Sequence, residues 1–93
     1  MSADLDLGSR PHLPRGVRMR RDEARGRWIL LAPERIFEID DIAATVLGLC
    51  DGVRDLKSIV AELASRFSAP EAKIQSDVVA MLHDLMTKRV LEL

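Results

Sequence analysis

The chain has 93 residues, of which 47% are hydrophobic, 31% are charged and only 3% are aromatic. This length allows one domain with a modest core, and the globular composition excludes a disordered chain. The single cysteine excludes an internal disulfide and indicates a reducing compartment. Few aromatic residues argue against a stacking surface for single-stranded nucleic acid, and the longest apolar run, Trp28–Ala32, is far too short to cross a membrane. We therefore expect a cytoplasmic protein.

Charge is unevenly distributed along the chain. A net charge of −1 and an isoelectric point near 6.1 conceal a basic segment, residues 10–27, with seven arginines and two acidic residues. Residues 28–93 carry seven basic and eleven acidic residues, a net charge of −4. The basic segment is either an attractive surface for nucleic acid or an acidic protein, or the solvated face of a sheet. The low isoelectric point argues against DNA as the main partner.

The first forty residues predict an arm followed by three strands. Residues 1–16 contain glycine, proline and serine without apolar periodicity, which predicts a flexible N-terminal arm. Apolar and polar residues alternate over 17–20, as in a half-buried strand, and a second strand follows over 27–32. Pro33 ends that second strand, because proline has no N–H for the ladder, and a short third strand spans 35–39.

From residue 40 onward, apolar residues recur at helical spacing. Asp40 or Asp41 suits the N-cap of a first helix, which Gly52 ends, and Asp55 caps a second. The run Ser68–Glu71 resembles a capping box before a third helix. Three strands followed by three helices indicate one α+β domain over residues 17–93, with the helices on one face of a three-stranded antiparallel sheet. The residues expected to face the core are Ile42, Val46, Leu49, Leu56, Ile59, Val60, Leu63, Phe67, Ile74, Val78, Met81, Leu82, Leu85 and Met86.

The sequence offers no catalytic constellation. His12 lies in the expected arm and His83 on the third helix, and neither stands at a metal-ligand spacing from Cys50. Cys50 falls on the inner side of the first helix, where a small buried hydrophobic residue is the simplest interpretation. Helix capping explains the adjacent carboxylates Asp40 and Asp41. We therefore expect no catalysis, no metal and no cofactor in this chain.

Two kinds of binding function remain for such a domain. A winged-helix nucleic-acid-binding module needs basic or amide side chains at the start of its recognition helix, where this chain offers Lys73 and Gln75 beside an acid. A peptide-binding module needs a sheet edge next to an apolar helix, and the short third strand supplies such an edge. The residues alone favour a peptide or protein partner over nucleic acid, and both readings stay open at this point.

Three segments of the sequence form a more specific pattern. They are Leu13–Arg18, Arg27–Arg35 with its Trp-x-Leu-Leu-Ala-Pro-Glu motif, and Leu49–Gly52 with Cys-Asp-Gly. In this order and spacing they resemble the PqqD family of pyrroloquinoline quinone biosynthesis, and the likeness extends over Leu13–Leu91. One departure is Asp55, where the family pattern has Thr or Ser, but aspartate fills the same capping role.

The resemblance implies a fold and a function. PqqD-like proteins have a winged-helix-like fold and are peptide chaperones of the recognition-element type for ribosomally synthesized and post-translationally modified peptides (RiPPs). They bind the precursor peptide PqqA and present it to PqqE, a radical SAM enzyme with iron–sulfur clusters that joins a glutamate and a tyrosine side chain of the peptide. The chemistry and its cofactors then belong to the partner. A winged-helix-like fold does not by itself imply DNA binding.

The third strand and third helix are the expected peptide site. An extended peptide would add to the free edge of the strand, and the helix would supply the wall of its side-chain pockets. We further expect Arg18 and Arg20 to project from the sheet and dock PqqE. The protein should be a monomer in dilute solution, with Ala32–Glu34 as a hinge that permits a hairpin-swapped dimer at high concentration. The expected peptide-binding residues are Arg35, Ile36, Phe37, Glu38, Ile39, Ile74, Val78, Met81, Leu82 and Leu85.

Overall fold

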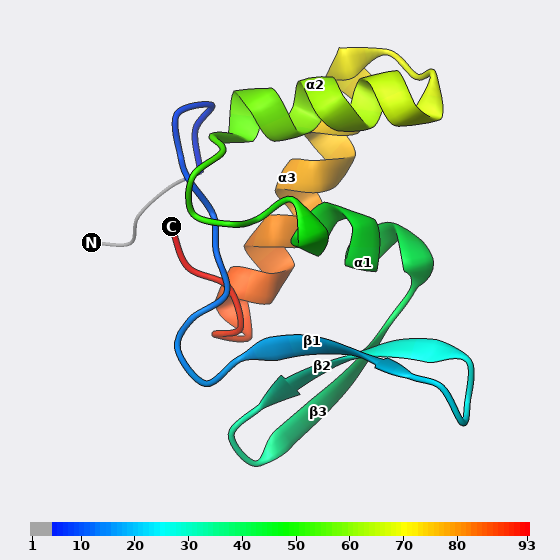
Figure 1. Ribbon diagram of the computed structural model, residues 1–93. Coiled ribbons are helices and arrows are strands. Elements are labelled where there is room, and N and C mark those ends of the chain that lie inside the picture. The colour runs from blue at the N-terminus through cyan, green and yellow to red at the C-terminus, as the bar shows by residue number, and fades with distance from the viewer. Residues whose placement is uncertain (1–4) are drawn as a thin grey trace.

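The structure is a computed structural model that describes residues 5–93. The sheet lies at one end of the molecule and the helices stack beyond it, with α1 next to the sheet (Figure 1). This arrangement confirms the predicted α+β fold. Within the described residues, no helix has the length and hydrophobicity needed to cross a bilayer. The elements are β1 (Arg18–Asp22), β2 (Arg27–Ala32), β3 (Arg35–Ile39), α1 (Asp41–Gly48), α2 (Leu56–Phe67) and α3 (Glu71–Thr87).

The three strands form one antiparallel sheet in the order β1-β2-β3. Only Pro33 and Glu34 join β2 to β3, because Ala32 pairs directly with Arg35. Proline at the first of these two positions and a φ of 59° at the second are typical of a tight β-turn. The segment Ala32–Glu34 is therefore a tight hairpin turn inside a continuous sheet of the single chain.

The two faces of the sheet have different surroundings. Leu30 of the central strand points toward the helices and is fully buried, and its cross-strand neighbour Phe37 lies on the same face. Ile36, the adjacent residue of β3, points to the opposite side and is 69% exposed. No helix of the described chain covers that side, which we call the outer face. Its residues include Arg18, Arg20, Ile29, Leu31 and Ile36.

The helix ends follow the sequence signals only in part. Asp40 and Asp55 cap α1 and α2, each accepting a hydrogen bond from the backbone N–H three residues later, at 2.7 and 2.8 Å. The predicted capping box before α3 is wrong, because Ser68 instead ends α2 in the left-handed conformation, and α3 begins without a side-chain cap. Helix α1 ends at Gly48 rather than at Gly52, which lies in the following turn.

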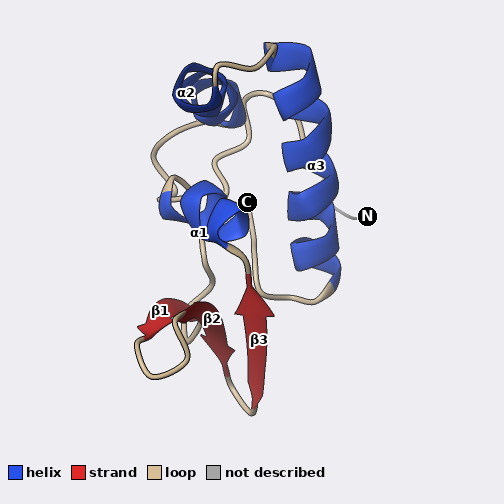
Figure 2. Cartoon of the chain, turned by 90° about the vertical axis from the view of Figure 1, so that its right-hand side faces the viewer, coloured by secondary structure: helices blue, strands red, loops and turns tan. Residues whose placement is uncertain are grey.

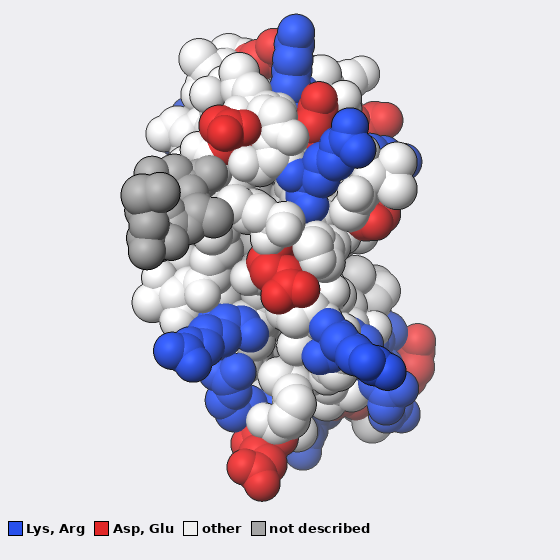
Figure 3. Space-filling view, turned by 90° about the vertical axis from the view of Figure 1, so that its left-hand side faces the viewer, with Lys and Arg blue, Asp and Glu red and all other residues white. Residues whose placement is uncertain are grey.

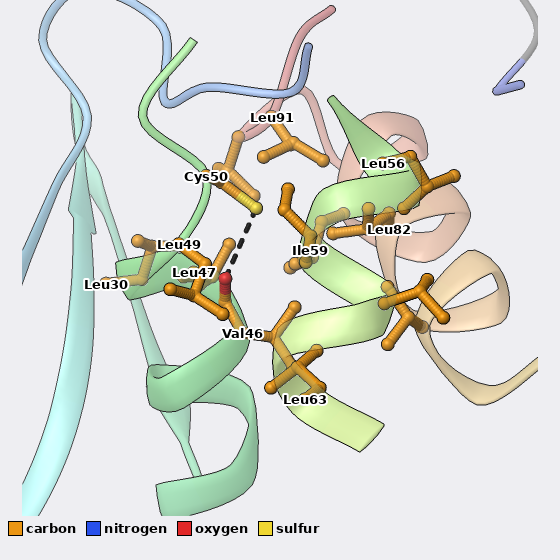
Figure 4. Packing of buried hydrophobic residues seen from close by; sticks show 14 residues of the cluster. Leu30, Val46, Leu47, Leu49, Cys50, Leu56, Ile59, Leu63, Leu82 and Leu91 are labelled. Atoms are coloured by element: carbon orange, nitrogen blue, oxygen red, sulfur yellow. Dashed lines mark hydrogen bonds between the residues drawn. The ribbon is translucent and has the colours of Figure 1, made fainter. Parts of the chain in front are cut away.

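The core lies between the helices and the central strand (Figure 4). Within it, the Cys50 thiol donates a hydrogen bond to the Val46 carbonyl at 3.3 Å. Burial, assisted by the Asp51 carboxylate, raises the pKa of this thiol to about 12, so it is a packing group and not a nucleophile. Ile42 and Phe67, both expected inside, are instead 58% and 47% exposed. The buried cluster comprises Leu30, Val46, Leu47, Leu49, Cys50, Leu56, Ile59, Val60, Leu63, Val78, Leu82, Leu85, Val90 and Leu91.

The expected flexible arm needs correction over residues 5–16. The carbonyls of Ser9 and Leu7 accept hydrogen bonds from the first two amides of α2, at 2.8 and 3.0 Å. These amides are donors that a helix N-terminus leaves free, so the segment satisfies them. His12 pairs with Glu92 through two backbone hydrogen bonds of 2.8 and 3.0 Å, which ties the segment of residues 5–16 to the C-terminal residues. The rest of the expected arm, residues 1–4, lies outside the described residues.

Candidate functional site

In the described part of the chain, the edge of β3 that points away from β2 is unpaired. One side of β3 pairs with β2, and no strand in the described part of the chain pairs with the other side. Alternate N–H and C=O groups of such a strand point away from its partner and can bond another chain. Figure 2 shows that β3 runs from the sheet end up to α1, beside the lower end of α3. The free edge therefore lies next to a helix.

A groove of about 240 Å³ lies between β3 and α3. Phe37 and Ile39 form its strand wall, and Met81 and Leu85 form its helix wall. Two charged side chains at its rim form an ion pair with each other: Lys88 Nζ lies 2.7 Å from Asp84 Oδ2. A ligand would therefore meet mainly apolar walls. The lining of this β3–α3 groove is Phe37, Glu38, Ile39, Asp40, Ala43, Met81, Asp84, Leu85 and Lys88.

Arg35 joins the two walls of the groove. Its Nη1 donates a hydrogen bond to the Lys88 carbonyl, the C-cap residue of α3, at 2.8 Å. A cation at a helix C-terminus also interacts favourably with the helix dipole. The same guanidinium lies 5.4 Å from the centre of the Phe37 ring. Arg35 thus sets the distance between the start of β3 and the end of α3, and acts as a tether of the groove.

A second hollow opens further along α3, among the three helices. It has a volume of about 160 Å³, and its walls are almost entirely apolar. Met81 lines both this hollow and the β3–α3 groove, so one side chain separates them. Its lining is Ile42, Val46, Leu63, Phe67, Ile74, Asp77, Val78 and Met81, and we call it the helical hollow.

The ten predicted peptide-binding residues lie in different parts of the structure. Leu82 is fully buried in the core and cannot wall the groove, which corrects that prediction. Ile74 and Val78 line the helical hollow rather than the groove, and Ile36 lies on the outer face. Arg35 is the tether, and the remaining five line the groove: Phe37, Glu38, Ile39, Met81 and Leu85.

Sequence reasoning missed four groove residues. Asp84 and Lys88 stand three and seven positions after Met81, so helical spacing alone could have found them. Asp40 and Ala43 come from the start of α1, and no sequence signal relates that helix to α3. Their place in the groove follows from the way β3 leads directly into α1.

The arginines predicted to dock a partner lie as expected on the outer face. Arg18 and Arg20 are exposed and stand opposite Leu31 and Ile29 in the β1–β2 register. Arg27, on the same face, forms an ion pair with Glu38 at 2.7 Å. Figure 3 shows Lys and Arg side chains grouped over the lower part of the molecule, the sheet end of Figure 1. Charged side chains along β1 also make this edge of the sheet a poor template for strand addition.

The His12–Glu92 pair and Asp51, outside the groove, make contacts that support the fold. His12 Nε2 lies 3.2 Å from Glu92 Oε1, so this pair adds to the backbone contact between the same two residues. The Asp51 carboxylate accepts hydrogen bonds from the backbone of Arg54 and Val53, which lowers its pKa. Across residues 5–93, no three His, Cys, Asp or Glu side chains come together in a group that could hold a metal ion.

Known proteins resemble this chain over most of its length. A Rhodopseudomonas palustris (strain BisB5) protein described as "PqqA binding protein" is 52% identical over 80 residues, which cover 86% of this chain and 78% of the relative. The crystal structure of PqqD from Xanthomonas campestris is 43% identical and covers 96% of this chain and 99% of that one, with a TM-score of 0.60.

A second solved structure is more similar in fold. It is the solution NMR structure of the PqqD part of Methylobacterium extorquens PqqCD, described as a functional and stand-alone RiPP recognition element. It matches with a TM-score of 0.83 and 45% identity, over 96% of this chain and 95% of that one. The family model described as coenzyme PQQ synthesis protein D matches residues 27–91. With its fold and its relatives in agreement, this chain belongs to the PqqD family.

Proposed function

We propose that this chain is a peptide chaperone of pyrroloquinoline quinone biosynthesis, which binds the precursor peptide PqqA as an added strand on β3 and presents it to the radical SAM enzyme PqqE. The observation that carries the proposal is the free edge of β3 beside an apolar groove. A relative 52% identical to this chain is described as a PqqA binding protein. The chain acts by binding, and the bond-forming chemistry belongs to the enzyme.

The geometry of β3 suits an extended peptide. Five residues of strand span about 16 Å at 3.3 Å per residue, so a peptide of similar length can pair with the whole edge. Every second side chain of that peptide would then face the groove and contact Phe37, Ile39 and Leu85. Backbone hydrogen bonds provide affinity in this mode, and the apolar groove selects the side chains.

The outer face supplies the surface for PqqE. An added peptide strand extends the sheet beyond β3, so its alternate side chains would lie in the same layer as Ile36, Arg18 and Arg20. An acidic enzyme surface attracted to the arginines would therefore meet the peptide at the same time. This arrangement gives the basic segment a role in presentation rather than in nucleic-acid binding.

The proposed oligomeric state is a monomer in dilute solution that can exchange its β1–β2 hairpin with a second copy at high concentration, with Ala32–Glu34 as the hinge. In the single chain this segment is a tight turn, and opening it would let β2 of one copy pair with β3 of the other through the same contacts. Light scattering that shows a tight dimer at low micromolar concentration would exclude the monomer.

A map of backbone amide shifts tests the peptide site. Synthetic PqqA is titrated into the labelled protein, with a DNA duplex as the control ligand. We expect peptide-induced shifts at residues 35–39 and 81–88 and none with DNA. Shifts confined to residues 18–27, with β3 silent, would exclude strand addition.

Peptides with single backbone N-methyl groups test the hydrogen bonds directly. N-methylation removes one donor without changing the side chain, so binding should weaken at every second position of the paired segment. Peptides methylated at the intervening positions, whose N–H groups point away from β3, serve as internal controls. A loss that is equal at all positions, or absent at all, contradicts pairing with the β3 edge.

A further inference from the structure

The helical hollow exposes apolar surface that the fold itself does not use. Ile42 and Phe67 on its rim are 58% and 47% exposed, whereas its floor, including Val46 and Leu63, is buried. Its only charged lining residue, Asp77, is paired with Lys73 at 3.2 Å. Water in this hollow therefore contacts mainly hydrocarbon, and an apolar group that displaced it would be stabilised.

The hollow continues the path of the β3–α3 groove. Met81 borders both, and the end of β3 leads through Asp40 to Ile42 on the rim of the hollow. Ile74 in the hollow and Leu85 in the groove lie eleven positions apart on α3, about 16 Å along the helix. An extended chain covers that distance in about five residues. A peptide that leaves the C-terminal end of β3 therefore reaches the hollow within a few residues.

We propose that the helical hollow receives one bulky apolar side chain of the same peptide, a few residues beyond the segment that pairs with β3. The volume of about 160 Å³ suits a ring or a branched aliphatic group, since an apolar cavity of about 150 Å³ in another protein holds benzene. Met81 is flexible and can adapt between the two subsites. This inference rests on the proposed function, and it makes the recognised ligand longer than the strand segment alone.

The peptide is a better occupant of this hollow than PqqE. The outer face, with Arg18 and Arg20, points away from the helices, so an enzyme docked there does not cover the hollow. A peptide held in the groove is already adjacent to it. Binding in the hollow then costs only the conformational entropy of the few peptide residues that link it to the strand segment, because pairing with β3 has already fixed that segment.

Serine substitutions on the rim test the proposal. Phe67→Ser and Ile42→Ser remove apolar contact from half-exposed positions, so the melting temperature should change little. We expect synthetic PqqA to bind each variant about five- to tenfold more weakly. The matched control is Val53→Ser, which removes an apolar side chain that is 73% exposed and lies outside both subsites. This control should bind like the unsubstituted protein.

An alanine scan of the apolar PqqA residues identifies the occupant. One alanine variant should weaken binding to the unsubstituted protein yet cause no further loss with Phe67→Ser, because the two changes remove the same contact. Methyl shifts of Ile74 and Val78 on peptide addition should accompany this coupling.

The outcomes separate this inference from the proposed function. If PqqA shifts the β3 amides but binds both rim variants with unchanged affinity, the hollow is not a peptide subsite and strand addition stands. If the rim variants lose PqqE binding or self-association but keep PqqA affinity, the occupant is a different one and the inference fails. If the β3 amides do not respond to PqqA at all, the proposed function itself fails.

Discussion

Removal of the Arg35 guanidinium is expected to loosen the β3–α3 groove. Arg35→Ala deletes the 2.8 Å hydrogen bond to the Lys88 carbonyl and the cation stacked 5.4 Å from the Phe37 ring. At an exposed site the hydrogen bond contributes about 1 kcal/mol and the stacked cation about 0.5–1 kcal/mol. The contact between β3 and α3 thus weakens by about 1.5–2 kcal/mol. If peptide binding needs both walls in place, its affinity should fall by up to about thirtyfold.

The assay combines urea denaturation with peptide titration. Trp28 is the only tryptophan, and it lies on β2 with Arg21 5.6 Å from its ring, so its fluorescence reports on the sheet. The matched control is Arg27→Ala, which also removes one arginine and one short contact, the 2.7 Å ion pair with Glu38 on the outer face. We expect the control to keep its peptide affinity. Arg35→Lys, which restores one donor but not the planar stacking, should be intermediate.

Two results would refute the tether. One is equal peptide affinity for Arg35→Ala and Arg27→Ala. The other is a loss of affinity in Arg35→Ala while hydrogen exchange of the β3 amides in the free protein stays unchanged. That second result would mean that Arg35 contacts the peptide directly and does not hold the strand against the helix.

Four further outcomes are expected. Cys50→Ser should cost about 1–2 kcal/mol in urea denaturation and leave peptide binding intact, because the site is buried and the hydroxyl can still donate to the nearby carbonyl. The hydrogen bond from the Ser58 backbone lowers the pKa of Asp55 below its unfolded value of 3.8. Its stabilising effect is therefore present above that value and lost as pH falls through the folded pKa, a dependence that Asp55→Asn should remove from acid denaturation curves. PqqE binding should weaken with rising salt and in the Arg18→Ala, Arg20→Ala double variant, and salt-independent binding contradicts the arginine surface. Purified, tag-free protein should contain no stoichiometric iron or zinc, which elemental analysis checks.

Local chemistry determined the elements of this fold. The alternation of apolar and polar residues identified β1. The aspartates Asp40 and Asp55 identified the starts of α1 and α2, because each caps its helix by a hydrogen bond to a backbone N–H only three residues away. The resemblance to the PqqD family came from other local segments, Leu13–Arg18, Arg27–Arg35 and Leu49–Gly52. A residue that lies between two helices gave a wrong prediction. Ser68 has the side chain of an N-cap for α3, but it adopts the left-handed conformation that ends α2.

Tertiary packing decided the site. Helical periodicity put Met81, Leu82 and Leu85 on one apolar stripe of α3, but only the position of β3 and α1 made Leu82 core and left Met81 between two subsites. Likewise, residues 5–16 lack any regular pattern, and they are ordered by amides of α2 and by Glu92 at the far end of the chain. The sequence by itself determined which elements form, since those signals are local. The tertiary structure decided which faces of these elements pack together, and therefore where a peptide can lie. Such packing depends on contacts between residues that are distant in sequence, and hydrophobic periodicity does not identify those contacts.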